Sequence, residues 1–198
     1  MFNLFKKKNA FDYPLINPPF PFKPLKEMNE EEAQRHLDWF VSQSEVRREI
    51  LLDAVERLGG NKDELDYSPE SLIPLWKAIS ARFEKRSLTE EEKAKFYSSI
   101  PAAAKQLNFS LKKQTTQTLC FAIDIGYYVA AIYMRRYPQV HWIVFKQKSM
   151  SFNKPALSGF RLPLVPNDMV RASIARQIRI PKDTHLFDMY QKWVTNLI

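Results

Sequence analysis

A single carboxylate, Asp124, interrupts the most apolar stretch of the chain, the residues between Leu119 and Met134. A charge among apolar side chains must be paired or hydrogen-bonded, because an uncompensated buried charge is costly. Two roles fit Asp124: a structural anchor that bonds a neighbouring backbone or an arginine, or the acid of a functional site. We find no second acid or histidine converging on it, so the sequence favours the polar anchor.

The other residue types with reactive side chains form no catalytic or metal-binding pattern. The three histidines, His36, His141 and His185, fall in different expected elements without metal-ligand spacing. The only cysteine, Cys120, lies in the same apolar stretch as Asp124, which favours packing over nucleophilic chemistry. The chain has four glycines and lacks the motifs of serine hydrolases, zinc proteases, dithiol enzymes and nucleotide-binding loops. We therefore expect a protein that is not an enzyme, with no cofactor and no metal.

Basic residues concentrate in the second half of the chain. The first 100 residues carry 16 Lys or Arg against 18 Asp or Glu, whereas the last 98 carry 14 against 4. This asymmetry predicts either a basic face with an acidic partner or acidic N-terminal helices that pack beside the basic half. No nucleic-acid recognition motif accompanies the basic residues, which favours a protein partner or a solvated face. The candidate binding residues are Arg135, Arg136, Lys146, Lys148, Arg161, Arg171, Arg176 and Arg179.

The stretch containing Asp124 predicts the element around which the chain is organised. Residues 115–137 have apolar side chains on every face of a helix, and such a helix belongs inside a fold. A membrane span is disfavoured, because the uncharged run is short and Asp124 would lie in hydrocarbon. Ala122, Gly126 and Ala130 form a seam of small residues on this helix, where another element can approach closely.

Residues 1–28 form a basic tail followed by an extended segment, which we call the strap. Its sequence, FDYPLINPPFPFKPL, has too many prolines for a helix. Its aromatic side chains predict that it covers the core of its own domain; the alternative is a ligand for an aromatic groove on a partner. We expect the remaining residues, 29–198, to form one domain.

Helical periodicity and caps place the other helices. Asn29 is the expected N-cap of a helical run that ends at Gly59 and Gly60, with a bend near Ser44 and Arg48. Residues 72–83 predict a second helix, and a capping box opens a short third helix at residue 89. Two final helices follow, one at 168–179 with Asn167 as its N-cap and one after Thr184.

The residues after the central helix change pattern. Residues 141–146 and 155–160 are short and rich in residues that favour strands, so they predict an antiparallel hairpin or small sheet. The expected fold class is therefore α+β and mainly α, with a long buried central helix, amphipathic helices around it, and this small sheet before two C-terminal helices.

Several segments resemble an uncharacterised bacterial family found in low-GC Gram-positive genomes. The resemblance rests on DIGYYVAAIYMRRYPQVHW, NKPALSGF and PNDMVRASIARQI, and on the N-terminal PPFPFKP and the turn DYSPESL. It covers most of the chain, and none of these motifs is catalytic. In size and style the chain is also similar to immunity proteins, which neutralise secreted toxins.

These observations predict a cytoplasmic, non-catalytic protein that binds another protein, such as a toxin. The single cysteine suits a reducing compartment, and no signal peptide is expected at the N-terminus. The alternative is a nucleic-acid-binding module that uses the basic C-terminal half.

Overall fold

The computed structural model describes residues 12–21, 23–101, 107 and 109–198. It is 55% helical, with seven α-helices among these residues, which confirms the expected mainly helical α+β class. The helices are α1 (Glu30–Ser42), α2 (Ser44–Arg57), α3 (Leu72–Ile79), α4 (Glu90–Ser99), α5 (Thr116–Arg136), α6 (Pro166–Arg179) and α7 (His185–Val194).

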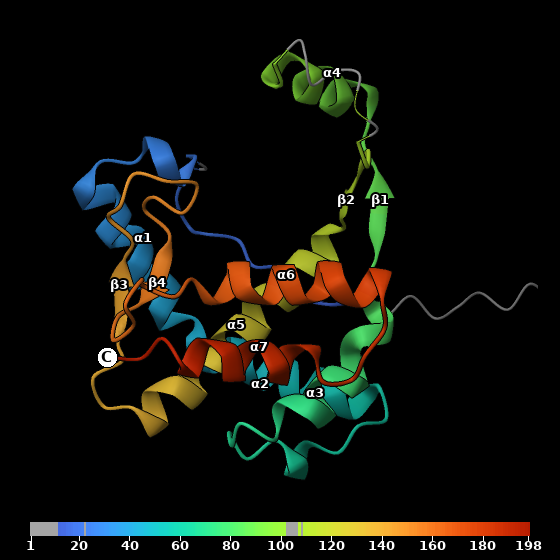
Figure 1. Ribbon diagram of the computed structural model, residues 1–198, viewed down its shortest axis with the longest axis vertical. Coiled ribbons are helices and arrows are strands. Elements are labelled where there is room, and N and C mark those ends of the chain that lie inside the picture. The colour runs from blue at the N-terminus through green and yellow to red at the C-terminus, as the bar shows by residue number, and fades with distance from the viewer. Residues whose placement is uncertain (1–11, 22, 102–106, 108) are drawn as a thin grey trace, which may run out of the picture.

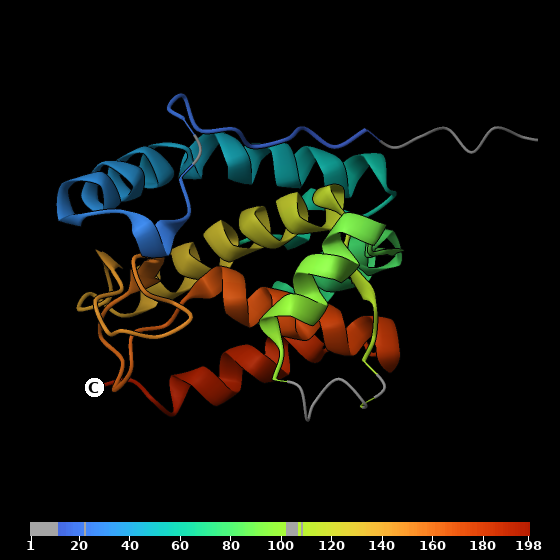
Figure 2. The ribbon, with the colours of Figure 1, turned by 90° about the horizontal axis from the view of Figure 1, so that it is seen from above.

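The buried helix α5 lies at the centre of the body, as expected. Helices α1 and α2 cover one side of it, and α6 and α7 cover the other (Figure 2). By length and composition alone α5 could cross a membrane, so the length of the whole helix does not exclude a span. However, 78% of its most apolar window is buried inside the protein, as in the core helices of soluble proteins.

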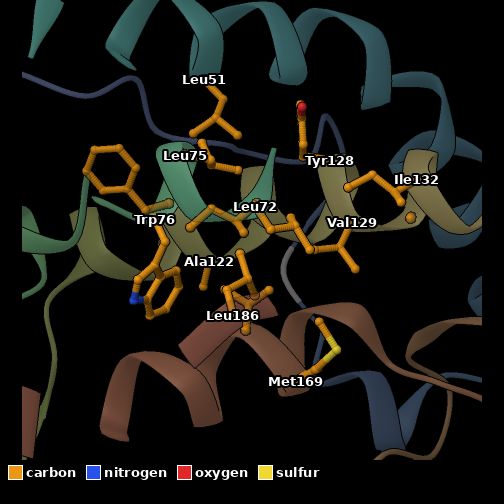
Figure 3. Packing of buried hydrophobic residues seen from close by; sticks show 14 of the residues in the cluster. Leu51, Leu72, Leu75, Trp76, Ala122, Tyr128, Val129, Ile132, Met169 and Leu186 are labelled. Carbon is orange, nitrogen blue, oxygen red and sulfur yellow. The ribbon is translucent and has the colours of Figure 1, made fainter. Parts of the chain in front are cut away.

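Residues from several helices meet around α5 in one apolar core. Figure 3 shows Leu51 of α2, Trp76 of α3 and Leu186 of α7 converging on Ala122 of α5. All four side chains are buried. Burying apolar surface of this extent supplies the main driving force for folding.

Tyrosine side chains give α5 polar contacts without breaking its apolar surface. The hydroxyl of Tyr127 donates to the carbonyl of Phe40, 2.7 Å away, and that of Tyr133 donates to the carbonyl of Tyr190 at 3.0 Å. Such bonds satisfy polar groups that would be costly to bury alone. They also fix α1 and α7 relative to the central helix.

Helix boundaries follow most of the predicted caps. Asn29 caps α1 through a full capping box, and the expected bend is a break at Gln43 between α1 and α2. The prediction for Asn167 was wrong: α6 begins at Pro166, and Val165 occupies the N-cap position. Proline is favoured in the first helical turn because its missing N–H would be unpaired there anyway, so the helix starts earlier than the asparagine suggests.

Two small antiparallel sheets complete the fold. The expected hairpin pairs β3 (Trp142–Val144) with β4 (Pro155–Leu157), with Ile143 opposite Ala156. A second ribbon was not anticipated: β1 (Lys85–Ser87) pairs with β2 (Lys112–Gln114), with Arg86 opposite Lys113. Figure 1 shows that this ribbon extends from the body and carries α4 at its far end. We call the described residues of this segment, 85–101, 107 and 109–114, the arm.

Candidate functional site

The described part of the strap packs on the core beside Asp124. Tyr13 is 2% exposed, and its ring stacks on Phe121 with a centroid separation of 3.9 Å. Its hydroxyl donates to Asp124 Oδ2. The strap therefore reaches the middle of α5 through a buried polar contact.

Arg47 of α2 is the main partner of Asp124. Its Nε lies 2.8 Å from Oδ1 and its Nη2 lies 2.7 Å from Oδ2, which is a two-pronged ion pair. The same guanidinium donates to the carbonyl oxygen of Pro14 in the strap at 2.9 Å. Both side chains are almost fully buried, with 5% and 0% exposure.

Burial and hydrogen bonding shift the pKa of Asp124, and likewise that of Arg47, in opposite directions. Burial raises the pKa of Asp124 to about 6, although the bonds from Arg47 and Tyr13 lower it. Burial lowers the pKa of Arg47, but its bonds with the carboxylate outweigh this and leave the pKa raised. The two-pronged contact with the guanidinium favours the ionised form of both groups. This arrangement matches a polar anchor, and the role of Asp124 beyond structure stays a prediction.

The eight predicted binding residues are exposed but come from three parts of the fold. Two lie at the C-terminal end of α5, three in the segment around β3 and β4, and three on α6. Helices α5 and α6 run in opposite directions, so their C-terminal ends lie on opposite sides of the body (Figure 1). The structure thus separates Arg135 and Arg136 from Arg176 and Arg179.

Three of these residues have neighbours within the protein. The guanidinium of Arg135 lies 3.8 Å from the centroid of the Tyr67 ring, which is cation–π geometry. Lys146 pairs with Glu30 at 2.7 Å, and Arg171 donates to Gln114 in the arm at 3.3 Å. Some of the predicted binding residues therefore connect elements of the fold.

The sequence predicted the helix α4 of the arm but not that it stands off the body on a ribbon. None of the ten residues of α4, all of which the structure describes, is buried. Its aromatic side chains meet each other instead: Phe96 lies edge-on to Tyr97 and to Phe109, with centroid separations of 5.5 and 5.2 Å. The only sequence indications of the arm were the capping box at Thr89 and these aromatic residues outside any apolar stripe.

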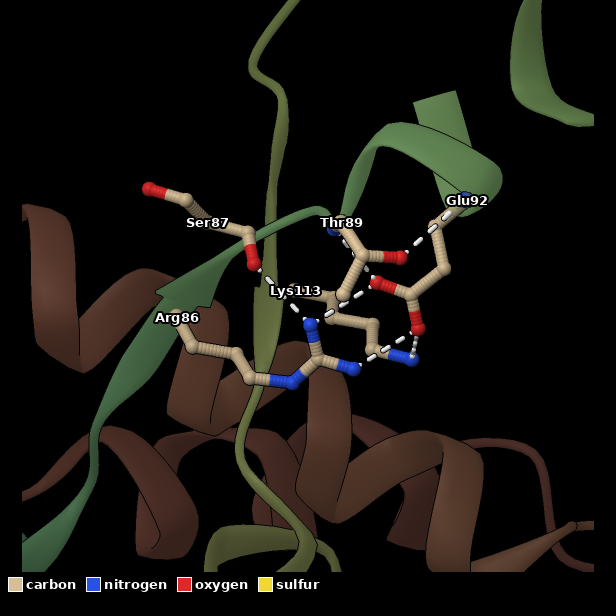
Figure 4. Close-up of polar contacts among 5 residues, drawn as sticks. All are labelled: Arg86, Ser87, Thr89, Glu92 and Lys113. Carbon is tan, nitrogen blue, oxygen red and sulfur yellow. Dashed lines mark hydrogen bonds and ion pairs between the residues drawn. The ribbon is translucent and has the colours of Figure 1, made fainter. Parts of the chain in front are cut away.

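A charged network joins α4 to its ribbon. Glu92 accepts hydrogen bonds from Arg86 at 2.7 and 2.8 Å, from the backbone N–H of Thr89, and from Lys113 (Figure 4). The bonds from Arg86, followed by those from Lys113, hold the pKa of Glu92 well below its usual range. Isolated ribbons and short helices are marginally stable, so this network helps to keep the arm ordered.

Elsewhere in the described part of the chain, polar side chains do not gather into a group that could carry out chemistry. In the part of the chain that the structure describes, no three His, Cys, Asp or Glu side chains are placed to hold a metal ion. His141 contacts the hydroxyl of Ser158 at 2.9 Å, but that hydroxyl also lies near the carbonyls of Gln139 and His141. The contact joins segments at the base of the β3–β4 hairpin.

Comparisons with known proteins give this chain no relative. No protein-family model, no curated protein and no solved structure matches it. The resemblance drawn from sequence segments therefore stays a prediction.

Proposed function

We propose that the protein is a non-catalytic, cytoplasmic binding protein that engages another protein through its arm. The observation that carries this proposal is the helix α4, which stands off the body on a two-stranded ribbon (Figure 1) and buries none of its described residues. A helix without a core to pack on gains stability when a partner covers it. A neutraliser of a toxin is one member of this class.

The chemistry of the arm defines the partner that it fits. Its tip presents Phe96, Tyr97 and Phe109, and Tyr97 is 37% exposed. Aromatic side chains of this kind are enriched among the residues that dominate binding energy. The ribbon below them carries one exposed lysine on each strand that lies outside the Glu92 network, Lys85 and Lys112. We therefore expect a partner with an apolar groove bordered by acidic residues.

Site-specific photocrosslinking tests this proposal. A benzophenone amino acid at Tyr97 should give one discrete adduct in cells that produce the protein, whereas the same group at the exposed Gln191 of α7 should not. The captured protein is then purified, and its affinity is measured by calorimetry for the wild type, the Phe96→Ala/Tyr97→Ala variant and a Gln191→Ala control. Loss of two anchors should weaken binding several hundredfold, since each costs roughly 2 kcal/mol and a factor of ten corresponds to about 1.4 kcal/mol.

Two outcomes would contradict the proposal. One is an unchanged affinity of the Phe96→Ala/Tyr97→Ala variant. The other is an adduct formed only between copies of this chain, which would make the arm a self-association surface.

The alternative is a nucleic-acid-binding module using the basic C-terminal half. It is supported by the three arginines of α6, Arg171, Arg176 and Arg179, which are all exposed on one helix. The salt dependence of binding separates it from the leading proposal.

A further inference from the structure

A cavity of about 660 Å³ lies between the strap and the helices α1, α5 and α6. This volume falls within the roughly 300–1,000 Å³ that small-molecule pockets occupy. The lining of the cavity includes no residue of α4, so its chemistry does not depend on the function proposed for that helix.

The walls of the cavity are mostly apolar and include several aromatic side chains. Phe20 of the strap and Trp39 of α1 stand edge to face with a centroid separation of 5.6 Å, and His36 lies at the same distance from Trp39. Helix α5 adds Leu119 and Ile123. Such walls suit the apolar body of a small molecule.

The charges around the cavity are mostly positive. Its lining includes four basic side chains, Lys23, Lys26, Lys154 and Arg171, against the single acid Asp168. Lys23 pairs with Glu32, and Lys154 pairs with Asp168 at 2.7 Å. Within the described residues no ion pair joins Lys26 or Arg171 to an acid, so these two cations are placed to receive an anion.

His36 adds a polar group to the apolar wall. Its Nδ1 is buried and has no hydrogen-bond partner among the described residues. Burial lowers the pKa of His36, which favours the neutral ring. Buried polar atoms in native proteins are nearly always bonded, so an unpartnered nitrogen at a cavity wall indicates a missing partner.

We propose that this cavity binds a small amphipathic acid, with its apolar body against Phe20, Trp39 and Ile123 and its anionic head near Lys26 and Arg171. The apolar walls favour a ligand with an apolar body, and the surplus of positive side chains favours a negatively charged head. A cationic amphiphile would face these same cations and is excluded by like-charge repulsion.

Calorimetric titration of the full chain at pH 7 tests both parts of the proposal. The probes are decanoate, decanol and decyltrimethylammonium, which share one apolar body and differ in the charge of the head. Decanoate should bind one to one, about tenfold more tightly than decanol, and the cation should not bind.

Matched variants test which residues form the binding site. Lys26→Gln/Arg171→Gln should weaken decanoate binding about tenfold and leave decanol unchanged. Lys77→Gln/Lys192→Gln removes the same charge at exposed positions outside the lining and should change neither. Ile123→Trp should narrow the apolar part of the cavity beside α5 and weaken the binding of both decanoate and decanol.

The proposal is overturned if decanoate shows no saturable binding, or if the three probes bind equally. It is also overturned if the lining and control pairs weaken decanoate to the same extent. The residues changed in both charge variants are exposed, so these measurements remain decisive even if Ile123→Trp does not fold.

Discussion

The guanidinium of Arg47 and the carboxylate of Asp124 face each other inside the protein, joined by two hydrogen bonds of 2.8 and 2.7 Å. Because Arg47 also bonds the carbonyl of Pro14, this pair connects three segments that are distant in sequence. A buried pair contributes little net stability over an apolar substitute, but removing one member is costly. Its main effect is to specify where the strap and α2 lie against α5.

Asp124→Leu should lower the free energy of unfolding by about 3–5 kcal/mol, because it leaves the charge of Arg47 buried without a partner. Asp124→Asn should lose less, since it keeps an acceptor for the guanidinium. The double variant Arg47→Met/Asp124→Leu should recover most of the loss. Urea denaturation followed by circular dichroism measures all three. Losses that simply add in the double variant would show that the two residues are not coupled.

Gly126→Leu should destabilise the protein by roughly 1–3 kcal/mol through overpacking. A Cβ at Gly126 would lie 2.3 Å from Asn167 Oδ1 and 3.4 Å from the backbone nitrogen of Asn167. The smaller change Gly126→Ala meets chiefly the side-chain oxygen, so adding Asn167→Ala should restore part of its stability. Thermal unfolding compares the variants. Wild-type melting of Gly126→Leu would mean that α5 and α6 are not in close contact there.

Glu92→Gln should loosen the arm without affecting the core. The change removes the ionic partner of Arg86 and Lys113, whereas Glu91→Gln, in the same helical turn, provides the control. Hydrogen-exchange protection should fall for the amides of β1, β2 and α4 and stay unchanged for α5. Equal protection in the two variants would show that the network does not order the arm.

The pH dependence of the arm follows from the same carboxylate. Because the pKa of Glu92 is depressed in the folded state, its contribution to stability is fully present above its ordinary pKa of 4.5. That contribution is lost as the pH falls below 4.5 toward the depressed value. Protection factors for β1 and β2 should therefore fall below pH 4.5 in the wild type and change less in Glu92→Gln. A matching fall in the variant would assign the effect to other acids.

Negligible retention on DNA or RNA is expected at about physiological ionic strength, where the Debye length is near 8 Å. If the basic half does bind nucleic acid, affinity must fall steeply with salt as counterions are released. Arg171→Gln/Arg176→Gln/Arg179→Gln should then flatten that slope. Filter binding of a random duplex measures it. Micromolar binding at this salt, abolished by the triple variant, would favour the alternative function.

The core of this fold was predictable because its determinants are local. Helix α5 carries apolar residues on all faces, and β3 consists of Trp, Ile and Val, which favour strands. The arm was not predictable, since β1 and β2 are short polar strands without apolar alternation. Their pairing depends on contacts such as Lys113 with Glu92, which lie 21 residues apart.

The polar anchor was predictable in kind but not in detail. Asp124 breaks the local apolar pattern, which requires some partner, but its own helix does not reveal which one. Arg47 gave a weak indication, because it lies four residues before the buried Leu51 and seven before Ala54, on the same helical face. The cavity had no sequence signature, since its shape depends on where the strap lies.

The contact between Tyr13 and Asp124 also sets an order of events during synthesis. The two residues are 111 positions apart. On a ribosome that adds about 5–20 residues per second, Asp124 is therefore added on the order of 6 to 20 seconds after Tyr13. Throughout that interval the aromatic and proline side chains of the strap face solvent and other proteins. Chaperones and proteases therefore have access to the strap in nascent chains. They lose this access once α5 has been made.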